Sequence, residues 1–295
     1  MMTNSEPRPT TVEEQKSDRS VEKRESDRSV EKQESDRSVE KRESEKSAVD
    51  LEPGAAILEA VDLDFAYGDV DVLDDVSVSL DSGRVTALVG PNGSGKTTLL
   101  RTLAGLQEPD GGAVRYHGPD AVREIGYLPQ QPAFRPGFTV LETLAFYSSL
   151  VGADRDDAAA RLERLGLADA TGRPVEALSG GMTRLLGIAQ ATVGDPPVVT
   201  LDEPASGLDP GMSTRVFEIA AELAEEGTAV LLTSHDLELV ERTADRVVLI
   251  DAGTVTEQGP PGEIFDRLGV ESLREAYEAS VTGDLYSVHV RSESE

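Results

Sequence analysis

The eight residues GPNGSGKT, positions 90–97, constrain the fold of this chain more than any other stretch. The apolar run VTALV comes directly before them and predicts a short buried strand, and KTTLLRTLAG predicts a helix. A strand, a glycine-rich turn and a helix in this order are the setting of the phosphate-binding P-loop, Gly-x-x-x-x-Gly-Lys-Ser/Thr. The sequence therefore predicts an α/β fold that binds the phosphates of a nucleotide at this turn.

Each part of the loop has a chemical role in this prediction. Glycines let main-chain N–H groups turn inward around the phosphates, and the N-terminus of the helix adds partial positive charge. Lys96 is expected to reach the β- and γ-phosphates, and the hydroxyl of Thr97 is expected to help hold Mg²⁺. The predicted nucleotide-binding residues of this segment are Gly90, Pro91, Asn92, Gly93, Ser94, Gly95, Lys96, Thr97 and Thr98.

The rest of the chain avoids lysine, which makes Lys96 stand out. The formal net charge is −28, and residues 51–295 carry 42 Asp and Glu against 17 Lys and Arg. Lys96 is the only lysine among them, and the other five lie in residues 1–50. An acidic body needs a directed positive charge to bind a polyphosphate, and the planar fork of arginine does not replace an ammonium group between two phosphates. Lysine is therefore kept where phosphate contact requires it.

The negative charge also indicates the environment of the protein. So many carboxylates repel one another in dilute solution, whereas at 1 M salt the Debye length falls to about 3 Å and the charges are screened. We therefore expect a halophilic source with a cytoplasm of high salt, rather than an ordinary acidic cytosolic protein. Nucleic acid is excluded as a partner, because no basic cluster occurs outside residues 1–50.

Other classes of protein are excluded by what the composition lacks. The chain contains no cysteine, which excludes disulfides and thiol catalysis, and its three histidines are too few to indicate structural zinc. No apolar run approaches the ~20 residues that span a bilayer, and the N-terminus has no apolar signal-peptide core. We therefore expect a soluble protein that works inside the cell.

Residues 1–54 differ in composition from the rest and are predicted to be a disordered, charged tail. Three copies of a nine-residue repeat follow one another between Ser17 and Glu43: SDRSVEKRE, SDRSVEKQE and SDRSVEKRE. Valine is the only apolar residue in each copy, so the segment buries too little surface to offset its ordering entropy. No chemistry is assigned to this tail.

Residues 55–261 alternate between predicted strands and helices, a pattern typical of crossover units and a mainly parallel sheet. ILEAVDLDFAYG and VLDDVSVSLDSG predict an N-terminal antiparallel β-subdomain, whereas REIGYLPQ, VVTLDEP, TAVLLTSH and RVVLIDAG predict strands of the P-loop core. A helix-rich stretch predicts an inserted α-helical subdomain at about 135–195. Residues 262–295 form a predicted C-terminal extension with one helix, ESLREAYEASV, and one strand, LYSVHV.

The run VVTLDEP, residues 198–204, predicts the second half of the phosphate site. VVTL is expected to be a buried strand, and two acids stand at its end. Asp202 is placed to bind Mg²⁺, usually through water, and Glu203 is placed to polarise the attacking water as general base. An acidic pair after a strand is weak evidence by itself, but beside a P-loop it is strong.

A second glycine-rich segment, LSGGM at residues 178–182, has no use in a simple P-loop enzyme. With it, the chain resembles the ATP-binding cassette (ABC) ATPases over about residues 57–260. The segment resembles the family's signature motif, with methionine in place of the frequent glutamine. GYLPQ resembles the Q-loop, SGLD the D-loop and TSH the segment of the switch histidine, and the tyrosine of FAYG resembles the aromatic that stacks on adenine in this family. The matching residues are Leu178, Ser179, Gly180, Gly181, Met182, Gln130, Asp209, His235 and Tyr67, with Val72 beside the adenine.

The resemblance implies an ABC ATPase fold and Mg²⁺-dependent ATP hydrolysis. Two such domains pack head to tail, and the ATP on one P-loop is capped by Ser179–Gly181 of the other chain. The implied cofactors are ATP and Mg²⁺, and a second copy of the chain is an implied partner. The implied catalytic residues are Glu203, Gln130 and His235, of which His235 would hold the γ-phosphate and the attacking water. The implied Mg²⁺ ligands are Thr97, Gln130 and Asp202.

A single cassette without a membrane span implies that a separate protein is driven. The leading hypothesis is the ATPase subunit of an export-type ABC transporter, held at the cytoplasmic face of the cell membrane only through a transmembrane permease subunit. Family members receive the coupling helices of the permease just after the Q-loop, where we expect Phe134 and Phe138 to be exposed. The alternative is a soluble ABC ATPase of an assembly system such as iron–sulfur cluster biogenesis. The permease would select the transported substrate.

Overall fold

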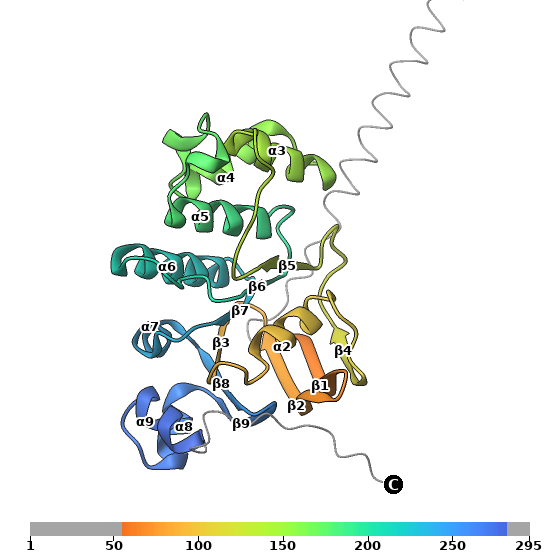
Figure 1. Ribbon diagram of the computed structural model, residues 1–295, viewed down its shortest axis with the longest axis vertical. Coiled ribbons are helices and arrows are strands. Elements are labelled where there is room, and N and C mark those ends of the chain that lie inside the picture. Colours follow the sequence, from red (N-terminus) through yellow and green to blue (C-terminus); the bar gives the residue numbers. More distant parts are fainter. Residues whose placement is uncertain (1–54, 282–295) are drawn as a thin grey trace, which may run out of the picture. The chain divides into compact units, whose positions relative to one another are not determined.

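The computed structural model describes residues 55–281 of the 295-residue chain. These residues belong to one compact unit, which Figure 1 shows with its helices and strands labelled. The predicted tail with its nonapeptide repeats, and the predicted strand LYSVHV, lie outside the described residues.

A six-stranded sheet forms the centre of the described part (Figure 1). Five strands run parallel, and β9 at one edge is antiparallel to β8. The inner strands are short apolar runs because both of their faces are covered, as parallel sheets require. In spatial order the strands are β5 (Ile125–Leu128), β6 (Val198–Leu201), β7 (Ala229–Thr233), β3 (Val85–Val89), β8 (Arg246–Asp251) and β9 (Thr254–Gly259).

A three-stranded antiparallel sheet stands beside the main sheet. The predicted pair of strands forms its hairpin, and Gly68 adopts a positive φ of 62° in the turn, which glycine tolerates. The pairing begins with Tyr67 opposite Val70. In spatial order the strands are β2 (Val70–Asp81), β1 (Ala56–Tyr67) and β4 (Gly111–Tyr116).

Helices cover both faces of the main sheet (Figure 1). Polar side chains cap several of them: Thr139, Asp154, Ser179 and Asp209 each accept a hydrogen bond from a main-chain N–H in the first turn. The helices are α2 (Lys96–Leu103), α3 (Val140–Leu150), α4 (Arg155–Arg164), α5 (Gly180–Ala191), α6 (Pro210–Glu225), α7 (Leu237–Thr243), α8 (Pro261–Leu268) and α9 (Leu273–Ser280), with short 3-10 turns at Ala168–Ala170 and Val175–Ala177.

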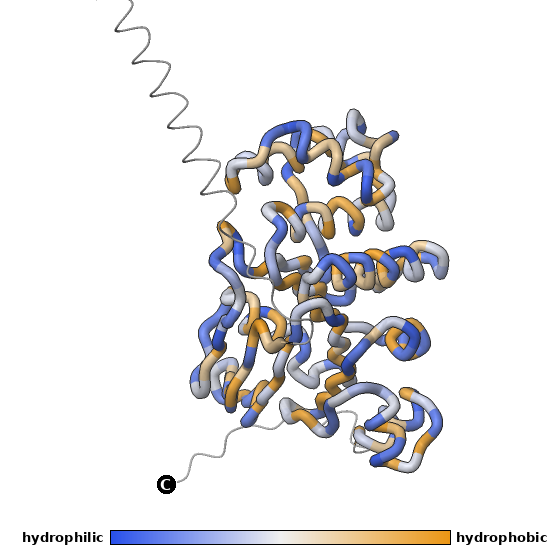
Figure 2. Tube along the Cα trace, turned by 180° about the vertical axis from the view of Figure 1, so that it is seen from behind, coloured by the Kyte–Doolittle hydropathy of each residue, from blue (hydrophilic) through white to orange (hydrophobic). Residues whose placement is uncertain are grey.

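The main sheet has a hydrophobic core on each face. Side chains alternate across strand β3: Ala87 and Val89 pack with helices α5, α6 and α7, whereas Leu88 packs with α2 and the three-stranded sheet. Hydrophobic residues follow the central strands, while helix α6 alternates between hydrophobic and hydrophilic residues along its length (Figure 2). Helix α2, which begins at the P-loop lysine, is therefore held between the two sheets.

The predicted fold class is confirmed: a P-loop core with a mainly parallel sheet, an antiparallel β-subdomain and inserted helices. Helices α3, α4 and α5 lie in the stretch where the sequence predicts the helical subdomain, 135–195. Helix α9 falls within the predicted ESLREAYEASV helix. Strands β4 and β9 and helix α8 are not among the elements that the sequence analysis expects.

Candidate nucleotide-binding and hydrolysis site

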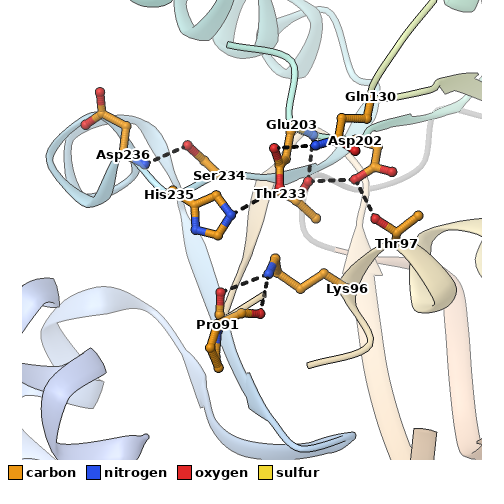
Figure 3. A network of polar contacts seen from close by, with 11 residues as sticks. Pro91, Lys96, Thr97, Gln130, Asp202, Glu203, Thr233, Ser234, His235 and Asp236 are labelled. Atoms are coloured by element: carbon orange, nitrogen blue, oxygen red, sulfur yellow. Dashed lines mark hydrogen bonds and ion pairs between the residues drawn. The ribbon is translucent and has the colours of Figure 1, made fainter. Parts of the chain in front are cut away.

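The carboxyl ends of four parallel strands meet at one edge of the main sheet, where open α/β sheets bind ligands. Strand β3 leads into the P-loop, β5 into Gln130, β6 into Asp202 and Glu203, and β7 into His235. Because β6 and β7 are neighbours in the sheet, the two acids and the histidine are brought together although about thirty residues separate them. Figure 3 shows their side chains facing the P-loop lysine.

The P-loop is held tightly by the residues around it. A Cβ atom at Gly90 would lie 2.1 Å from the carbonyl oxygen of Ile250, and one at Gly95 would lie 2.7 Å from that of Val72. Gly93 and Gly95 have φ angles of 86° and 97°, which side-chain-bearing residues rarely adopt. These glycines are therefore required by space and by backbone conformation. Asn92 and Gly93 are exposed at the tip of the loop, whereas the next three residues are buried.

Lys96 is folded back onto its own loop. Its ammonium group donates to the carbonyl oxygens of Gly90 at 2.9 Å and Pro91 at 2.7 Å, and the residue is 7% exposed (Figure 3). Burial lowers the pKa of Lys96, and the negative charges of Glu203 and Asp202 partly oppose this effect. The only lysine of residues 51–295 is thus a desolvated cation bonded to neutral acceptors.

Asp202 is almost completely buried, with an exposed fraction of 1%. Its Oδ1 accepts hydrogen bonds from the hydroxyls of Thr97 at 3.2 Å and Thr233 at 3.1 Å. Its Oδ2 is buried and has no hydrogen-bond partner within the described residues. Burial raises the pKa of the Asp202 carboxyl, and the hydrogen bonds from Thr97 and Thr233 partly oppose this effect.

These oxygens fit a magnesium ion. Mg²⁺ prefers hard oxygen ligands and is usually bound by one or two carboxylates together with substrate phosphates and water. Asp202 supplies a buried carboxylate oxygen without another partner, and the Thr97 hydroxyl lies beside it. No group of three or more His, Cys, Asp or Glu side chains within residues 55–281 could form an all-protein cage. The donor set therefore fits a metal ion that takes some of its ligands from the protein and the others from a bound nucleotide.

Glu203 is the centre of a polar network between two loops (Figure 3). Its Oε2 accepts a hydrogen bond from the Gln130 amide at 2.8 Å, and its Oε1 lies 3.1 Å from His235 Nε2. Its φ angle of 44° lies in the left-handed region, which is strained for a residue with a side chain. The structure thus brings together Gln130, Glu203 and His235, as the sequence predicts for the catalytic group.

Thr233 is a residue of this network that sequence reasoning missed. Its hydroxyl donates to Asp202 and accepts a 2.7 Å hydrogen bond from the main-chain N–H of Glu203. One hydroxyl therefore fixes the side chain of one acid and the main chain of the other. The signal that could have found it is a hydroxyl residue at the buried end of β7, two positions before His235.

Val72 borders the P-loop, and Tyr67 stands on the same β1–β2 hairpin. Tyr67 is 53% exposed, its ring meets Phe65 edge to face at 4.9 Å, and its hydroxyl donates to the Gln107 side-chain oxygen at 3.1 Å. Val72 is half-buried, and its carbonyl faces Gly95. An exposed, braced ring of this kind is a suitable platform for a nucleobase.

The predicted signature residues do not join this network within the chain. Ser179 and Gly180 are exposed, and Ser179 caps α5 by accepting a 3.3 Å hydrogen bond from the Met182 N–H. Leu178 is half-buried, and Gly181 packs beside Met212 of helix α6. Asp209, in the predicted D-loop, is exposed and caps α6 through the Met212 N–H at 3.1 Å.

The expected exposure of Phe134 and Phe138 is wrong. Both are half-buried: Phe134 packs against the core, and the guanidinium of Arg135 lies over the Phe138 ring at 5.1 Å. The exposed aromatic residue of this region is Phe146, at 54%. Phe146 is exposed because the buried residues Val140 and Leu144 of helix α3 lie one turn apart and leave it on another side of the helix.

A P-loop core with an Asp–Glu pair at the end of a second parallel strand, β6, and a second glycine-rich helix start defines the ATP-binding cassette class of ATPases. The ABC transporter family matches residues 73–206. The daunorubicin/doxorubicin resistance ATP-binding protein DrrA of Streptomyces peucetius is 37% identical over 237 residues, 77% of this chain and 72% of its own. The chain therefore belongs to the ABC transporter family, whose ATP-binding subunits bind ATP and are ATPases.

Further relatives and solved structures agree with this assignment. The Nod factor export ATP-binding protein I of Ralstonia nicotianae is 37% identical over 220 residues, covering 71% of this chain and 68% of its own. The ATP-binding subunit of an ABC transporter superposes with a TM-score of 0.68 at 29% identity, covering 75% of this chain and 98% of that one. A nucleotide-free ABC transporter cassette gives 0.66 at 27% identity, covering 76% and 99%.

Between residues 55 and 281 no helix combines the length with the apolar composition that crossing a bilayer needs.

Proposed function

We propose that this chain hydrolyses ATP, with Mg²⁺, at sites shared between two copies, and that the reaction drives export through a separate transmembrane permease. The observation that carries the hydrolytic part is the position of Glu203. It is held by Gln130 and His235, and it follows Asp202 at the edge where the P-loop opens. A carboxylate in this position can accept a proton from a water molecule beside the γ-phosphate.

Phosphate binding begins with an exchange of partners at Lys96. The ammonium group leaves the carbonyls of Gly90 and Pro91 and binds the β- and γ-phosphates, while the loop's N–H groups and the start of α2 bind their oxygens. Thr97, Asp202 and Gln130 are the side chains that would hold Mg²⁺. The ion would neutralise charge on the phosphate oxygens.

Hydrolysis then needs a base and a fixed water. Glu203 takes one proton from the water, whose oxygen bonds to the γ-phosphorus as the bond to the β–γ bridging oxygen breaks, giving ADP and phosphate. His235, beside Glu203, would hold the γ-phosphate and orient the water. The strained backbone of Glu203, fixed by Thr233, keeps the carboxylate in place for this step.

The second copy supplies the signature segment. Ser179 and Gly180 are exposed at the start of α5, where the first N–H groups of a helix have no intrahelical partner. Such N–H groups bind phosphate readily. In a head-to-tail pair, the segment Ser179–Gly181 of one copy would cap the ATP bound by the other.

Helix α3 offers the contact surface for the permease. Phe146 is 54% exposed and Leu150 is 65% exposed, and they stand one turn apart on the helix that follows the Gln130 loop. Two exposed hydrophobic side chains one turn apart favour this surface for a protein contact. The names of the relatives, a resistance protein and an export protein, support export as the direction. The subunit would then work at the cytoplasmic face of the membrane.

Purification of the tagged full chain from its native membranes tests this function. We expect a protein with several membrane spans to co-purify, and we expect Phe146→Asp to lose it. Val122→Asp is the matched control, because Val122 is 78% exposed but lies before β5, outside helix α3. Recovery of the wild type without any membrane protein, and in complex with a soluble assembly system, would favour a soluble ABC ATPase instead.

A further inference from the structure

Arg184 is a buried cation with no role in the mechanism above. It stands on α5, five residues after Ser179, and is 8% exposed. Its guanidinium donates to main-chain carbonyls: Nη1 to Gln130 at 2.6 Å and Pro129 at 3.4 Å, and Nη2 to Ser206 at 3.5 Å. Burying a charge is unfavourable unless its donors are used, so these carbonyl contacts account for its place in the interior.

The carbonyls that Arg184 binds belong to the two segments that hold Glu203. Gln130 carries one of these carbonyls, and its side-chain amide donates to the Glu203 carboxylate at 2.8 Å. Ser206 carries another, and its main-chain N–H donates to the Glu203 carbonyl at 3.1 Å. One guanidinium thus binds both the segment whose Gln130 side chain contacts Glu203 and the turn that follows Glu203.

The same helix begins at the signature segment. A helix is a rigid element, so Ser179 at its start and Arg184 in its second turn move together. Gly187 lies on the same face as Arg184, three residues further on. A Cβ atom there would lie 2.5 Å from Leu128 Cδ1 and 3.2 Å from Pro132 Cβ. Helix α5 is therefore packed so closely against residues 128–132 that it cannot shift without moving the Gln130 loop.

We propose that Arg184 is a positioning residue that couples the two ATP sites of the dimer. The inference rests on the proposed function, in which Ser179–Gly181 of one copy contact the γ-phosphate bound by the other. A shift of α5 toward that phosphate is transmitted through Arg184 to Gln130, and from Gln130 to Glu203 of the same chain. This Glu203 hydrolyses the ATP on its own P-loop, so the nucleotide at one site sets the geometry of hydrolysis at the other.

The substitution Arg184→Lys tests the coupling in the full chain. Lysine keeps the positive charge but lacks the planar fork that reaches Gln130 and Ser206 at once. We expect wild-type hydrolysis to rise cooperatively with ATP, with a Hill coefficient above 1. In the variant the Hill coefficient should fall to about 1 and kcat should fall about tenfold, within the range of coupling residues. Binding of a fluorescent ATP analogue should stay within about twofold, because Arg184 does not touch the P-loop.

Arg123→Lys is the matched control. Arg123 is half-buried and also donates to main-chain carbonyls, to Gln190 at 2.9 Å and Ile125 at 3.2 Å. It ties the other end of α5 to β5, away from Glu203. We expect a comparable loss of thermal stability but an unchanged Hill coefficient. Unaltered kinetics in Arg184→Lys, or an equal loss of cooperativity in both variants, would overturn the coupling.

A second measurement leaves Arg184 in place, in case the lysine variant does not fold. An isotope-labelled Lys96→Ala chain, whose own P-loop has lost its phosphate contact, is mixed with a Glu203→Gln chain and ATP. The coupling predicts slower hydrogen exchange at residues 128–131 of the labelled chain. Unchanged exchange there overturns it. Failure of the Glu203→Gln chain alone to form an ATP-dependent dimer overturns the proposed function itself, which separates the two failures.

Discussion

The P-loop network (residues 90–98 with Gln130, Asp202, Glu203, Thr233 and His235) and the signature segment (residues 178–182) are two regions of one chain. They differ in where their polar groups find partners. In the network, Lys96 and Asp202 are buried, and their hydrogen bonds are made within the chain. In the signature segment, Ser179 and Gly180 are exposed, and the first N–H groups of α5 lack intrahelical partners. The first region is prepared to receive a ligand by internal contacts, whereas the second is prepared for contact with something outside the chain.

Because of this difference, substitutions in the two regions should disable different ATP sites of the dimer. Changes in the P-loop network should disable the site on the same chain. Changes in the signature segment should disable the site on the other chain. Four experiments examine this separation, and they run from the largest expected effect to the smallest.

Glu203→Gln should have the largest effect. Glutamine keeps the shape of the side chain but cannot accept the proton, so hydrolysis should fall about 10²- to 10⁴-fold. ATP binding should remain, because the P-loop is unchanged, and an ATP-bound dimer should accumulate. Phosphate release and size-exclusion chromatography with ATP and Mg²⁺ measure the two effects.

The control for this experiment is Glu226→Gln, which removes the same charge. Glu226 is exposed and pairs with Arg164 at 2.6 Å on the surface, where an ion pair contributes little. It should leave hydrolysis unchanged. A Glu203→Gln chain that stays monomeric and turns over ATP at the wild-type rate would contradict the general-base role.

Ser179→Arg tests whether the signature segment acts on the other chain. The long side chain should block phosphate contact, and hydrolysis should fall about 10²-fold, the loss typical of a removed phosphate-binding donor. Mixing this variant with Lys96→Ala should restore part of the activity, since the mixed dimer contains one site with an intact P-loop and an intact signature. Ser149→Arg, at another exposed helical serine, is the control. Absence of any recovery in the mixture would contradict action between chains.

Lys96→Ala tests the phosphate role against the effect of salt. For the wild type, the melting temperature should rise steeply from 0.1 M to multi-molar KCl, because the Debye length contracts from about 10 Å to about 3 Å or less. At low salt, ATP with Mg²⁺ at 100 times its Kd should stabilise the fold by about 2.7 kcal/mol. The variant should lose this stabilisation and keep the salt dependence. A flat salt curve for the wild type would contradict the high-salt cytoplasm.

Asp202→Asn should have the smallest effect when only the melting temperature without nucleotide is measured, and that effect should be stabilising. Burial raises the pKa of Asp202 above its ordinary value of 3.8, so the folded state binds the proton more tightly than the unfolded state. The ionised carboxylate therefore lowers stability above the folded pKa, and this loss is absent below the unfolded pKa. At pH 7 we expect the variant to melt about 1–4 °C higher.

The pH dependence is the check on that last experiment. The gap between Asp202→Asn and the wild type should close as the pH falls below the ordinary pKa of 3.8, where the wild-type carboxyl becomes protonated in both states. In the variant, Mg²⁺ should add nothing to the stabilisation by ATP. A variant that melts lower than the wild type at every pH would contradict the account of Asp202 as an unfavourably buried charge.

The fold was largely predictable because its central elements carry strong local patterns. The buried strands β3, β6 and β7 are short runs rich in β-branched and other apolar residues, and each ends in a motif. Strands β4 and β9 are edge strands with half-exposed sequences, GGAVRY and TVTEQG, so hydrophobic alternation gives little signal. Helix α8 buries Ile264 alone and begins with a proline and a glycine, which weakens its pattern.

The candidate site was predictable where a motif names the residue and not where only three-dimensional contact does. Gln130, Glu203 and His235 lie together as their motifs suggest. Thr233 and Arg184 act through hydrogen bonds to groups that are distant in the sequence. No motif marks Arg184, and the only local signal for Thr233 is its hydroxyl at the buried end of β7. The exposure of Phe134 and Phe138 was not predictable for the same reason, because it depends on contacts of the folded chain, with the core for Phe134 and with Arg135 for Phe138.

The single lysine of residues 51–295 makes one amine the only target for acylation in that part of the chain. Reagents and enzymes that modify or cut at lysine meet Lys96 alone there, and the surrounding P-loop shields it. Bound phosphates would cover the same nitrogen. Its lowered pKa makes the neutral, nucleophilic amine more abundant than in an exposed lysine at the same pH. Mass spectrometry after a brief pulse of an acylating reagent therefore reads nucleotide occupancy from one atom, without any label built into the protein.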